Sequence, residues 1–307
     1  MAEQRNIGMD HDHYEWSPFV NRGLLTWPDN AQIALCVITN LEHLEWSRPI
    51  NSYQSPTIAG GRGERPFPNY LRFSHREYGH RVGIFRVLDV LRKHNIPPTI
   101  AMDALTAEHY PSLVRYCMDN GCEFIGHGIS VSRMISSNMA EQEERDYIHS
   151  SLKILKEATG SRPVGWLGPE YGESHRTPRL LAEAGIQYVC DWVNDDQPYP
   201  MKTPQGELYS LPILLDLEDS NALSERHMSI DGYARLLMEA FDTLYAEGAY
   251  SGRMLVLNLH PWLIGQPFRI RFLDEALKYI MSHKRVWATT GSQVIKWYRN
   301  NQPLKQK

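Results

Sequence analysis

Short apolar runs alternate along this chain with segments whose apolar residues recur every three or four positions. The run at residues 33–39 is continuous and rich in β-branched residues, which is typical of a strand buried on both faces of a parallel sheet. Residues 81–94 keep the spacing of a helix stripe, and Pro97 and Pro98 follow directly. The alternation continues to residue 299 and predicts an α/β fold in which helices connect parallel strands.

The pattern predicts eight strands and seven helices. The strands are expected at residues 33–39, 98–103, 122–128, 164–168, 186–192, 207–213, 254–261 and 286–291. The helices are expected at 81–94, 107–119, 148–159, 179–184, 233–244, 272–280 and 292–299, with Gly121 and Gly160 as stop signals. We interpret residues 25–300 as one barrel-like catalytic domain, preceded by an arm (1–24) and followed by a tail (301–307). A long loop at 47–74 has no periodicity, and we interpret it as a lid or an oligomer contact.

Composition narrows the possible partners. The 307 residues are 42% hydrophobic, as in globular proteins, and the net charge of -4 comes from well mixed charges. No basic block is present to bind nucleic acid, and no apolar window is long enough to span a membrane. The opening segment lacks the pattern of a secretion signal, so we expect a cytoplasmic protein, with a homo-oligomer compatible with the apolar helix faces. The four cysteines lack metal or redox spacing and are interpreted as free thiols.

Ionisable residues stand where three of the predicted strands end. These are Glu42, His127 and His260, and the carboxyl ends of barrel strands share one rim. Hydrolysis of an amide needs a base, a donor for the oxyanion and an acid for the leaving nitrogen. We interpret Glu42 as the base, with its pKa raised by burial, or as a carboxylate that orients a histidine. His127 would polarise the carbonyl or bind water, His260 would be the acid, and a structural role is the alternative for both.

Further candidates lie near these strand ends. Glu170 is a second candidate base, and Asn40 lies on the same strand as Glu42. Asp191, Asn194, Asp195 and Asp196 would orient His260 or bind substrate, or would only form a turn. Trp166, Tyr171, Trp192 and Trp46 would wall the pocket or belong to the core. Arg76, Glu77 and Arg81 precede the predicted helix at 81–94, where they would bind a substrate carboxylate or form an ion pair that anchors the long loop.

Several ordered segments resemble the polysaccharide deacetylase, or NodB-homology, superfamily, and within it the branch of cofactor-independent allantoinases. The segments are TNLEHLE, REYGHRVGIFRVLDVL, EFIGHG, RPVGWLGPEYGESHRTPRLLAEAGIQYVCDWVNDDQPY and LNLHPWLIGQPFR. The resemblance covers roughly residues 25–298. It implies a distorted (β/α) TIM-like barrel and hydrolysis of a carbon–nitrogen bond in an amide, an N-acetyl group or a cyclic ureide.

The departures from this resemblance concern the metal and the substrate. Sugar deacetylases of the superfamily carry two adjacent aspartates after the first strand, where this chain has Leu41 and Glu42. They also carry two histidines four residues apart, where this chain has His127 and Val131. A zinc or another divalent metal would use Glu42, His127 and His260, with help from Ser130 or Ser132, but our first expectation is that no cofactor is required. The allantoinase-like branch carries an arginine after the glycine that Pro169 follows here, which argues against allantoin as the substrate.

Three hypotheses about function remain after this reading. The first is a hydrolase of a small linear or cyclic amide or ureide. The second is a metal-dependent deacetylase of an N-acetylated sugar, with a place in carbohydrate metabolism. The third is a noncatalytic barrel that binds a carbohydrate or metabolite, against which the ionisable groups at three strand ends argue.

Overall fold

One strongly curled sheet organises the fold. The computed structural model describes residues 10–47, 49 and 68–301. In this part of the chain the sheet has nine strands. They are β1 (Ile33–Leu41), β2 (Pro98–Met102), β3 (Glu123–Gly126), β4 (Gly165–Trp166), β5 (Tyr188–Val189), β6 (Tyr199–Met201), β7 (Leu208–Ser210), β8 (Arg253–Leu259) and β9 (Val286–Ala288).

The strand order is β6-β7-β5-β4-β3-β2-β1-β8, with β9 paired to the start of β1. Every pair is parallel except β6 with β7. Because β8 and β6 are not paired to each other, the curled sheet is a distorted half barrel, which confirms the predicted fold class.

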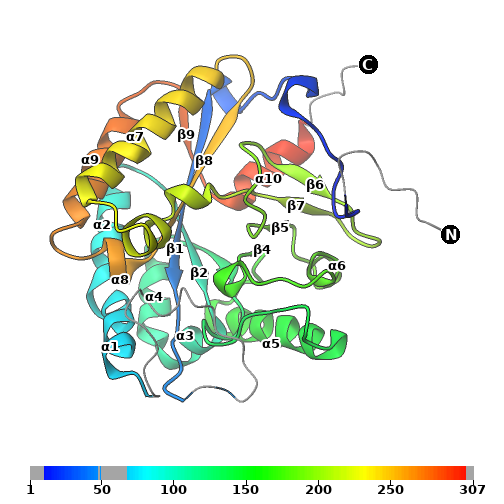
Figure 1. Cartoon of the computed structure of the whole chain (residues 1–307), viewed down its shortest axis with the longest axis vertical. Coiled ribbons are helices and arrows are strands. Elements are labelled where there is room, and N and C mark those ends of the chain that lie inside the picture. The colour runs from blue at the N-terminus through cyan, green and yellow to red at the C-terminus, as the bar shows by residue number, and fades with distance from the viewer. Residues whose placement is uncertain (1–9, 48, 50–67, 302–307) are drawn as a thin grey trace.

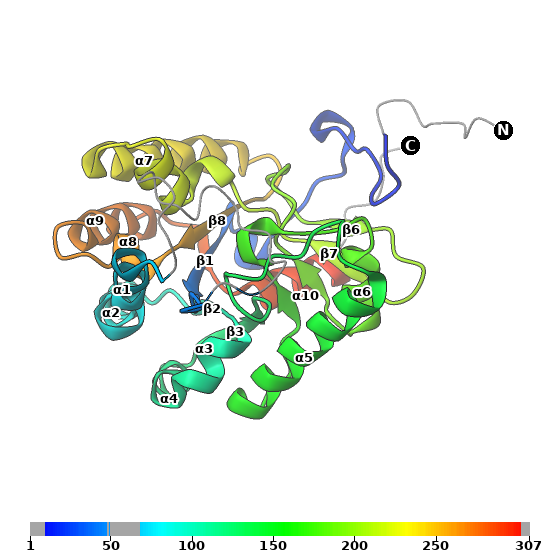
Figure 2. The same ribbon diagram turned by 60° about the horizontal axis from the view of Figure 1, so that its bottom comes forward.

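Helices surround the sheet, as Figures 1 and 2 show. Figure 2 places α1, α2, α7, α8 and α9 together on one side and the helices from α3 to α6 around the other. Their bounds are α1 (Tyr70–Tyr78), α2 (Ile84–Lys93), α3 (Ala104–His109), α4 (Pro111–Asp119), α5 (Glu141–Thr159), α6 (Thr177–Glu183), α7 (Ile230–Glu247), α8 (Pro261–Ile264), α9 (Ile270–Met281) and α10 (Gly291–Asn300). Among the described helices none is long and apolar enough to cross a membrane.

Alternate residues of the central strands pack into two different cores. In β1, Ile33, Leu35 and Val37 belong to the core shared with α2, α7 and α9. Ala34 and Cys36 belong to the core inside the curl of the sheet. Since successive side chains point to opposite faces of a strand, the even-numbered residues of β1 point to the inside. All nine residues of β1 are buried, so the continuous apolar run is explained by burial on both faces.

The segment before α2 differs from the prediction. Helix α1 begins at Tyr70, with the Asn69 side chain accepting a hydrogen bond from the backbone of Arg72, and a π-helical turn at Gly79–Gly83 joins it to α2. Residues 70–74 at the end of the predicted loop are therefore helical. Residue 48 and residues 50–67, on which the lid or oligomer contact was predicted, lie outside the described residues.

Two further boundaries differ for local reasons. Pro111 starts a new helix, so the predicted helix at 107–119 is divided into α3 and α4. Strand β6 was not predicted, because it is a three-residue edge strand that contains Pro200. The other predicted strands and helices are present, although β4 and β5 are shorter than expected.

Candidate active site

The inward-pointing residues of three strands lead to one cavity. Beyond Ala34, Cys36 and Ile38, the same inward parity of β1 continues through Asn40 to Glu42. Ile125 of β3 is followed two positions later by His127, and Val256 of β8 leads through Asn258 to His260. Asn40, Glu42, His127, Asn258 and His260 all line a cavity of about 310 Å³ at the carboxyl ends of these strands. The predicted convergence of the three strand ends is confirmed.

Glu42 is buried and holds its negative charge between three cationic or protonatable groups. Its Oε2 accepts a hydrogen bond from Nη1 of Arg76 at 2.6 Å, and its Oε1 lies 3.3 Å from Nε2 of His127 and 3.9 Å from Nε2 of His260. Burial by itself raises the pKa of Glu42, but Arg76 and the two histidines lower it well below its usual range. The expectation of a raised pKa was therefore wrong, because Arg76 reaches the carboxylate from α1.

His260 is fixed by a carboxylate on the loop before α7. Its ring Nδ1 lies 2.8 Å from Oδ1 of Asp219, and its backbone N–H donates to the same carboxylate at 2.9 Å. Burial opposes protonation of the ring, but Asp219 followed by Glu42 and Glu218 raises the pKa of His260 to about 9. His260 is thus protonated at neutral pH, as an acid must be. Asp219, and not the cluster from Asp191 to Asp196, orients it.

Glu218 is a second buried carboxyl group of the cavity. Its Oε1 lies 3.7 Å from Nε2 of His260 and accepts a hydrogen bond from Nδ2 of Asn258 at 3.0 Å. The pKa of Glu218 is raised to about 7, mainly by burial. The nearby His260 lowers it, and repulsion by Asp219, Glu170 and Glu42 adds to the increase. Glu218 was not among the site residues predicted from the sequence, since the segment that carries it has no periodicity that would show where its side chains point.

His127 spans from the strand end to Glu42. Its Nδ1 lies 2.6 Å from the carbonyl oxygen of Leu167, which can only accept, so this nitrogen carries the proton. Burial disfavours the charged ring, but the contact with Glu42 raises the pKa of His127 above its ordinary value. Its Nε2 therefore faces Glu42 as a donor.

Glu170 and Tyr171 form a strained turn in the cavity wall. Both have positive φ, at 54° and 55°. For residues other than glycine this backbone region is unfavourable, and such strain concentrates at functional sites. The Tyr171 hydroxyl accepts a hydrogen bond from Nδ2 of Asn258 at 2.9 Å, and Glu170 Oε1 lies 3.9 Å from Nη2 of Arg76. Both residues line the cavity, as predicted.

Arg81, Trp166 and Asp191 are predicted site residues that do not line this cavity. Arg81 is 72% exposed and faces Glu77 at 3.8 Å. It lies within the helical run that begins at Tyr70, so no helix N-terminus is present there. Trp166 is fully buried in the core between the sheet and α5 and α6, because it has the opposite parity to Leu167. Asp191 is half-buried next to the cavity wall, where it accepts a hydrogen bond from the backbone of Gly168 at 2.7 Å.

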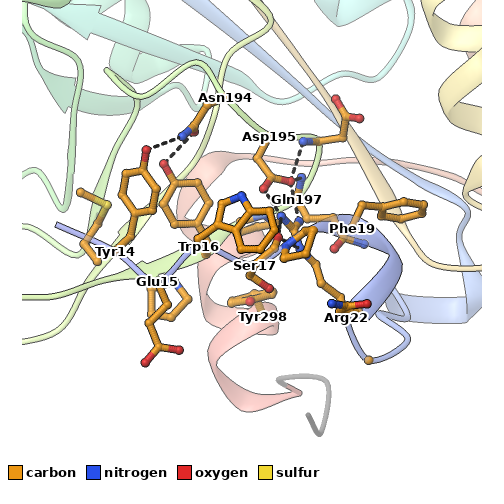
Figure 3. Close-up of a pocket in the computed structure, with 18 of the residues that line it drawn as sticks. Tyr14, Glu15, Trp16, Ser17, Phe19, Arg22, Asn194, Asp195, Gln197 and Tyr298 are labelled. Carbon is orange, nitrogen blue, oxygen red and sulfur yellow. Dashed lines mark hydrogen bonds and ion pairs between the residues drawn. The ribbon is translucent and has the colours of Figure 1, made fainter. Parts of the chain in front are cut away.

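Trp192, Asn194 and Asp195, which were also predicted to belong to the site, lie around the N-terminal arm. The ring of Trp192 stands edge-on to that of Tyr14. Asn194 bonds with Tyr14 and Tyr199, and Asp195 accepts a hydrogen bond from Arg22 at 2.7 Å. Figure 3 shows Asn194 and Asp195 in a separate hollow of about 1320 Å³ between the arm and the barrel. This hollow is larger than the cavity at the strand ends but contains no catalytic set of groups, so we place the candidate site at the strand ends.

The donor set does not fit a catalytic metal. In the described part of the chain, no group of three or more histidine, cysteine, aspartate or glutamate residues is arranged to hold a metal ion. The charge of Glu42 is already balanced by Arg76 at 2.6 Å, and a dication there would face that guanidinium. Val131 is fully buried at the position where a second histidine was considered. We therefore derive no catalytic step through a metal.

The chain is similar in sequence and in structure to known proteins. A family model described as polysaccharide deacetylase matches residues 77–189. The crystal structure of PuuE allantoinase superposes with a TM-score of 0.80 at 31% identity, over 91% of this chain and 94% of that one. A probable polysaccharide deacetylase from Pseudomonas aeruginosa PAO1 gives a TM-score of 0.79 at 29% identity over the same shares, 91% and 94%.

A curated relative extends the same likeness at lower identity. The peptidoglycan deacetylase of Helicobacter pylori (strain ATCC 700392 / 26695) is 22% identical over 75% of this chain and 88% of its own length. The two structural matches each cover 91% of this chain, and the family model covers residues 77–189. The chain belongs to the polysaccharide deacetylase family, and it is a hydrolase of carbon–nitrogen bonds other than peptide bonds.

Proposed function

We propose that this enzyme hydrolyses a linear or cyclic amide or ureide in a small metabolite, with Glu218 as the general base and His260 as the general acid. The observation that carries the proposal is the pairing of these two groups at one place. Glu218 Oε1 lies 3.7 Å from His260 Nε2, and their pKa values are about 7 and about 9. Near pH 8 the base is largely ionised while the acid is still protonated.

The proposed first step is attack by water. Glu218 takes a proton from a water molecule in the cavity as the water oxygen bonds to the carbonyl carbon, which leaves a negative charge on the carbonyl oxygen. The guanidinium of Arg76 and the ring of His127, whose Nε2 faces Glu42, line the cavity and stabilise this charge in a buried site. Their contacts with Glu42 hold them in place before the substrate enters, so little reorganisation is needed.

The proposed second step breaks the carbon–nitrogen bond. His260 gives the proton of Nε2 to the leaving nitrogen as the carbonyl re-forms, and the products are a carboxylic acid and an amine. Glu218 is then protonated and His260 is neutral. Return of one proton from Glu218 to His260 restores the starting state, through a bridging water across the gap of 3.7 Å. In this scheme Glu42 is a fixed charge that holds Arg76 and His127, and not the base.

The size of the cavity supports a small substrate. A volume of about 310 Å³ is at the lower end of ligand pockets, which typically hold one small molecule. Deacetylation of an N-acetylated sugar is the second candidate, and it is favoured by the names of two of the relatives. The Arg76–Glu42 pair supports the first candidate, since it occupies the carboxylate that a metal-dependent deacetylase would use.

Turnover of a panel of small amides, ureides, allantoin and N-acetylglucosamine tests the proposal, with and without a chelator. We expect chelator-resistant hydrolysis of at least one small amide or ureide. Glu218→Gln should lower kcat by about 10²- to 10⁴-fold, the usual contribution of a general base. Glu239→Gln, an exposed change on α7, is the control and should keep wild-type rates. Chelator-sensitive hydrolysis of the sugar alone would contradict the proposal.

A further inference from the structure

Arg72 brings an unpaired guanidinium into the candidate active-site cavity. It lies on α1 four residues before Arg76, so the two side chains share one side of the helix, and both line the cavity. Arg76 donates to Glu42 at 2.6 Å. The Nε and Nη2 atoms of Arg72 are buried and have no hydrogen-bond partner within the described structure. The cavity therefore contains two guanidinium groups. That of Arg76 pairs with Glu42, and that of Arg72 has two buried donors without an acceptor.

This arrangement is costly without a ligand. Burial first, and then repulsion by Arg76, lower the pKa of Arg72 to about 9, and the carboxylates of Glu170 and Glu42 only partly oppose this. Buried donors without acceptors and like charges four residues apart on a helix both destabilise a fold. Proteins retain such groups where a bound ligand supplies the missing partner.

We infer that Arg72 binds a carboxylate carried by the substrate, so that the substrate class is an N-acyl or ureido carboxylic acid. This inference rests on the function proposed above and adds that the substrate carries a negative charge. A guanidinium presents parallel N–H donors that match the two oxygens of a carboxylate. Glu42, Glu170 and Glu218 line the same cavity, and they would repel a doubly charged phosphate more strongly than a singly charged carboxylate.

The inference separates this substrate class from the substrates of the named relatives. Allantoin and N-acetylglucosamine are uncharged near neutral pH, and either would leave the half-buried Arg72 without a counter-charge. A substrate with a carboxylate at one end and the scissile amide at the other would place the first against α1 and the second near Glu218 and His260. Both groups line the one cavity of about 310 Å³.

Calorimetric binding to matched ligands tests the inference without turnover. The probes are N-acetyl and N-carbamoyl derivatives of glycine, alanine and aspartate, each paired with its neutral C-terminal amide. Binding is measured with the Glu218→Gln protein, which should not consume them, alone and combined with Arg72→Gln. Arg92→Gln is the matched control, because Arg92 lies on α2, is 68% exposed and pairs with Asp89.

We expect at least one acid to bind about tenfold or more tightly than its amide, and this preference to vanish with Arg72→Gln but to persist with Arg92→Gln. Equal binding within every pair, a preference that survives Arg72→Gln, or no binding of any acid would overturn the inference. Carboxylate-selective binding by a protein that hydrolyses none of the probes would overturn the proposed function and leave the inference about Arg72 standing.

The stability of the free protein gives a second readout. Arg72→Met keeps much of the apolar stem and removes the unpaired charge, so we expect a higher Tm than that of the wild type. A lower Tm would assign Arg72 a structural role and would overturn the inference.

Discussion

The ring Nδ1 of His260 lies 2.8 Å from Oδ1 of Asp219, and the backbone N–H of His260 donates to the same carboxylate. Two contacts from one carboxylate fix both the ring and the strand end that carries it. The proton on Nδ1 leaves Nε2 to face Glu42 and Glu218, at 3.9 and 3.7 Å. Asp219 is therefore a positioning residue in the proposed mechanism, and it separates the pKa of the acid from that of the base.

The pH dependence of kcat/KM should be bell-shaped. Below about pH 7 Glu218 is protonated and cannot act as a base, and above about pH 9 His260 is neutral and cannot act as an acid. Steady-state kinetics from pH 5 to 10 measure both limbs. In Glu218→Gln the residual kcat/KM should no longer fall as the pH drops below about 7. A persistent limb near pH 7 in that variant would assign the base to another residue.

Asp219→Asn should move the alkaline limb to lower pH. Without its main stabilising charge, the pKa of His260 falls from about 9 toward the ordinary value of 6.5, so less acid is available at neutral pH. Asp216→Asn is the control, because Asp216 is on the same loop, is 67% exposed and pairs with Arg226. A general loss of rate with an unchanged alkaline limb would show that Asp219 acts only on the fold.

The same substitution has a signed effect on stability. A group with a raised pKa in the folded state stabilises the protein fully below its unfolded value, here 6.5, and this contribution is lost as pH rises through about 9. The stability lost in Asp219→Asn should therefore be larger at pH 6 than at pH 10. Urea unfolding at both pH values measures it, and equal losses would contradict the ion pair as the cause.

Arg76→Met should destabilise the fold by about 3–5 kcal/mol at neutral pH, because it leaves the buried Glu42 without its closest cation. The pKa of Glu42 is depressed in the folded state, so its contribution is present above the unfolded value of 4.5 and lost as pH falls through the lower folded value. The difference between wild type and variant should thus shrink in urea titrations as pH falls below 4.5.

Arg76→Lys serves as the companion variant for that measurement. It keeps the charge but not the guanidinium geometry, so we expect a smaller loss of stability with the same pH trend. A loss for Arg76→Met that does not change with pH would mean that packing against Trp262, over which the guanidinium lies at 5.0 Å, accounts for it.

Gly83→Ala should destabilise the junction between the helical run and the end of β8. A Cβ at residue 83 would clash with the backbone carbonyl of Pro261, the residue after His260. A carbonyl of the main chain cannot move aside as a flexible side chain does, so we expect a cost of about 1–3 kcal/mol. Thermal unfolding measures it, and Gly121→Ala, where no atom lies within 4 Å of the added Cβ, is a control for φ strain alone.

The periodicity of the apolar residues was sufficient to predict the strands that carry the site. Asn40 and Glu42 continue the inward parity of β1, and Asn258 and His260 continue that of β8, so the cavity-facing residues could be read from the alternation itself. The same parity places Leu167 inside and Trp166 outside. Trp166 was predicted to line the site, but this alternation places its side chain on the outer face of the sheet.

The sequence by itself determined the alternation of most strands and helices and the convergence of Glu42, His127 and His260, because these depend on local periodicity and on parallel strands ending at one edge. The distorted form of the barrel was implied by the family resemblance. Only the tertiary structure decided which charged groups lie next to Glu42 and His260. Glu218 and Asp219 lie on a loop without periodicity, and Arg76 reaches Glu42 from α1, a helix that was not predicted from the sequence. A pKa depends on the sum of burial and of every nearby charge, and here those charges come from elements far apart in the chain. For that reason the pKa of Glu42 proved lowered where burial alone had suggested that it is raised.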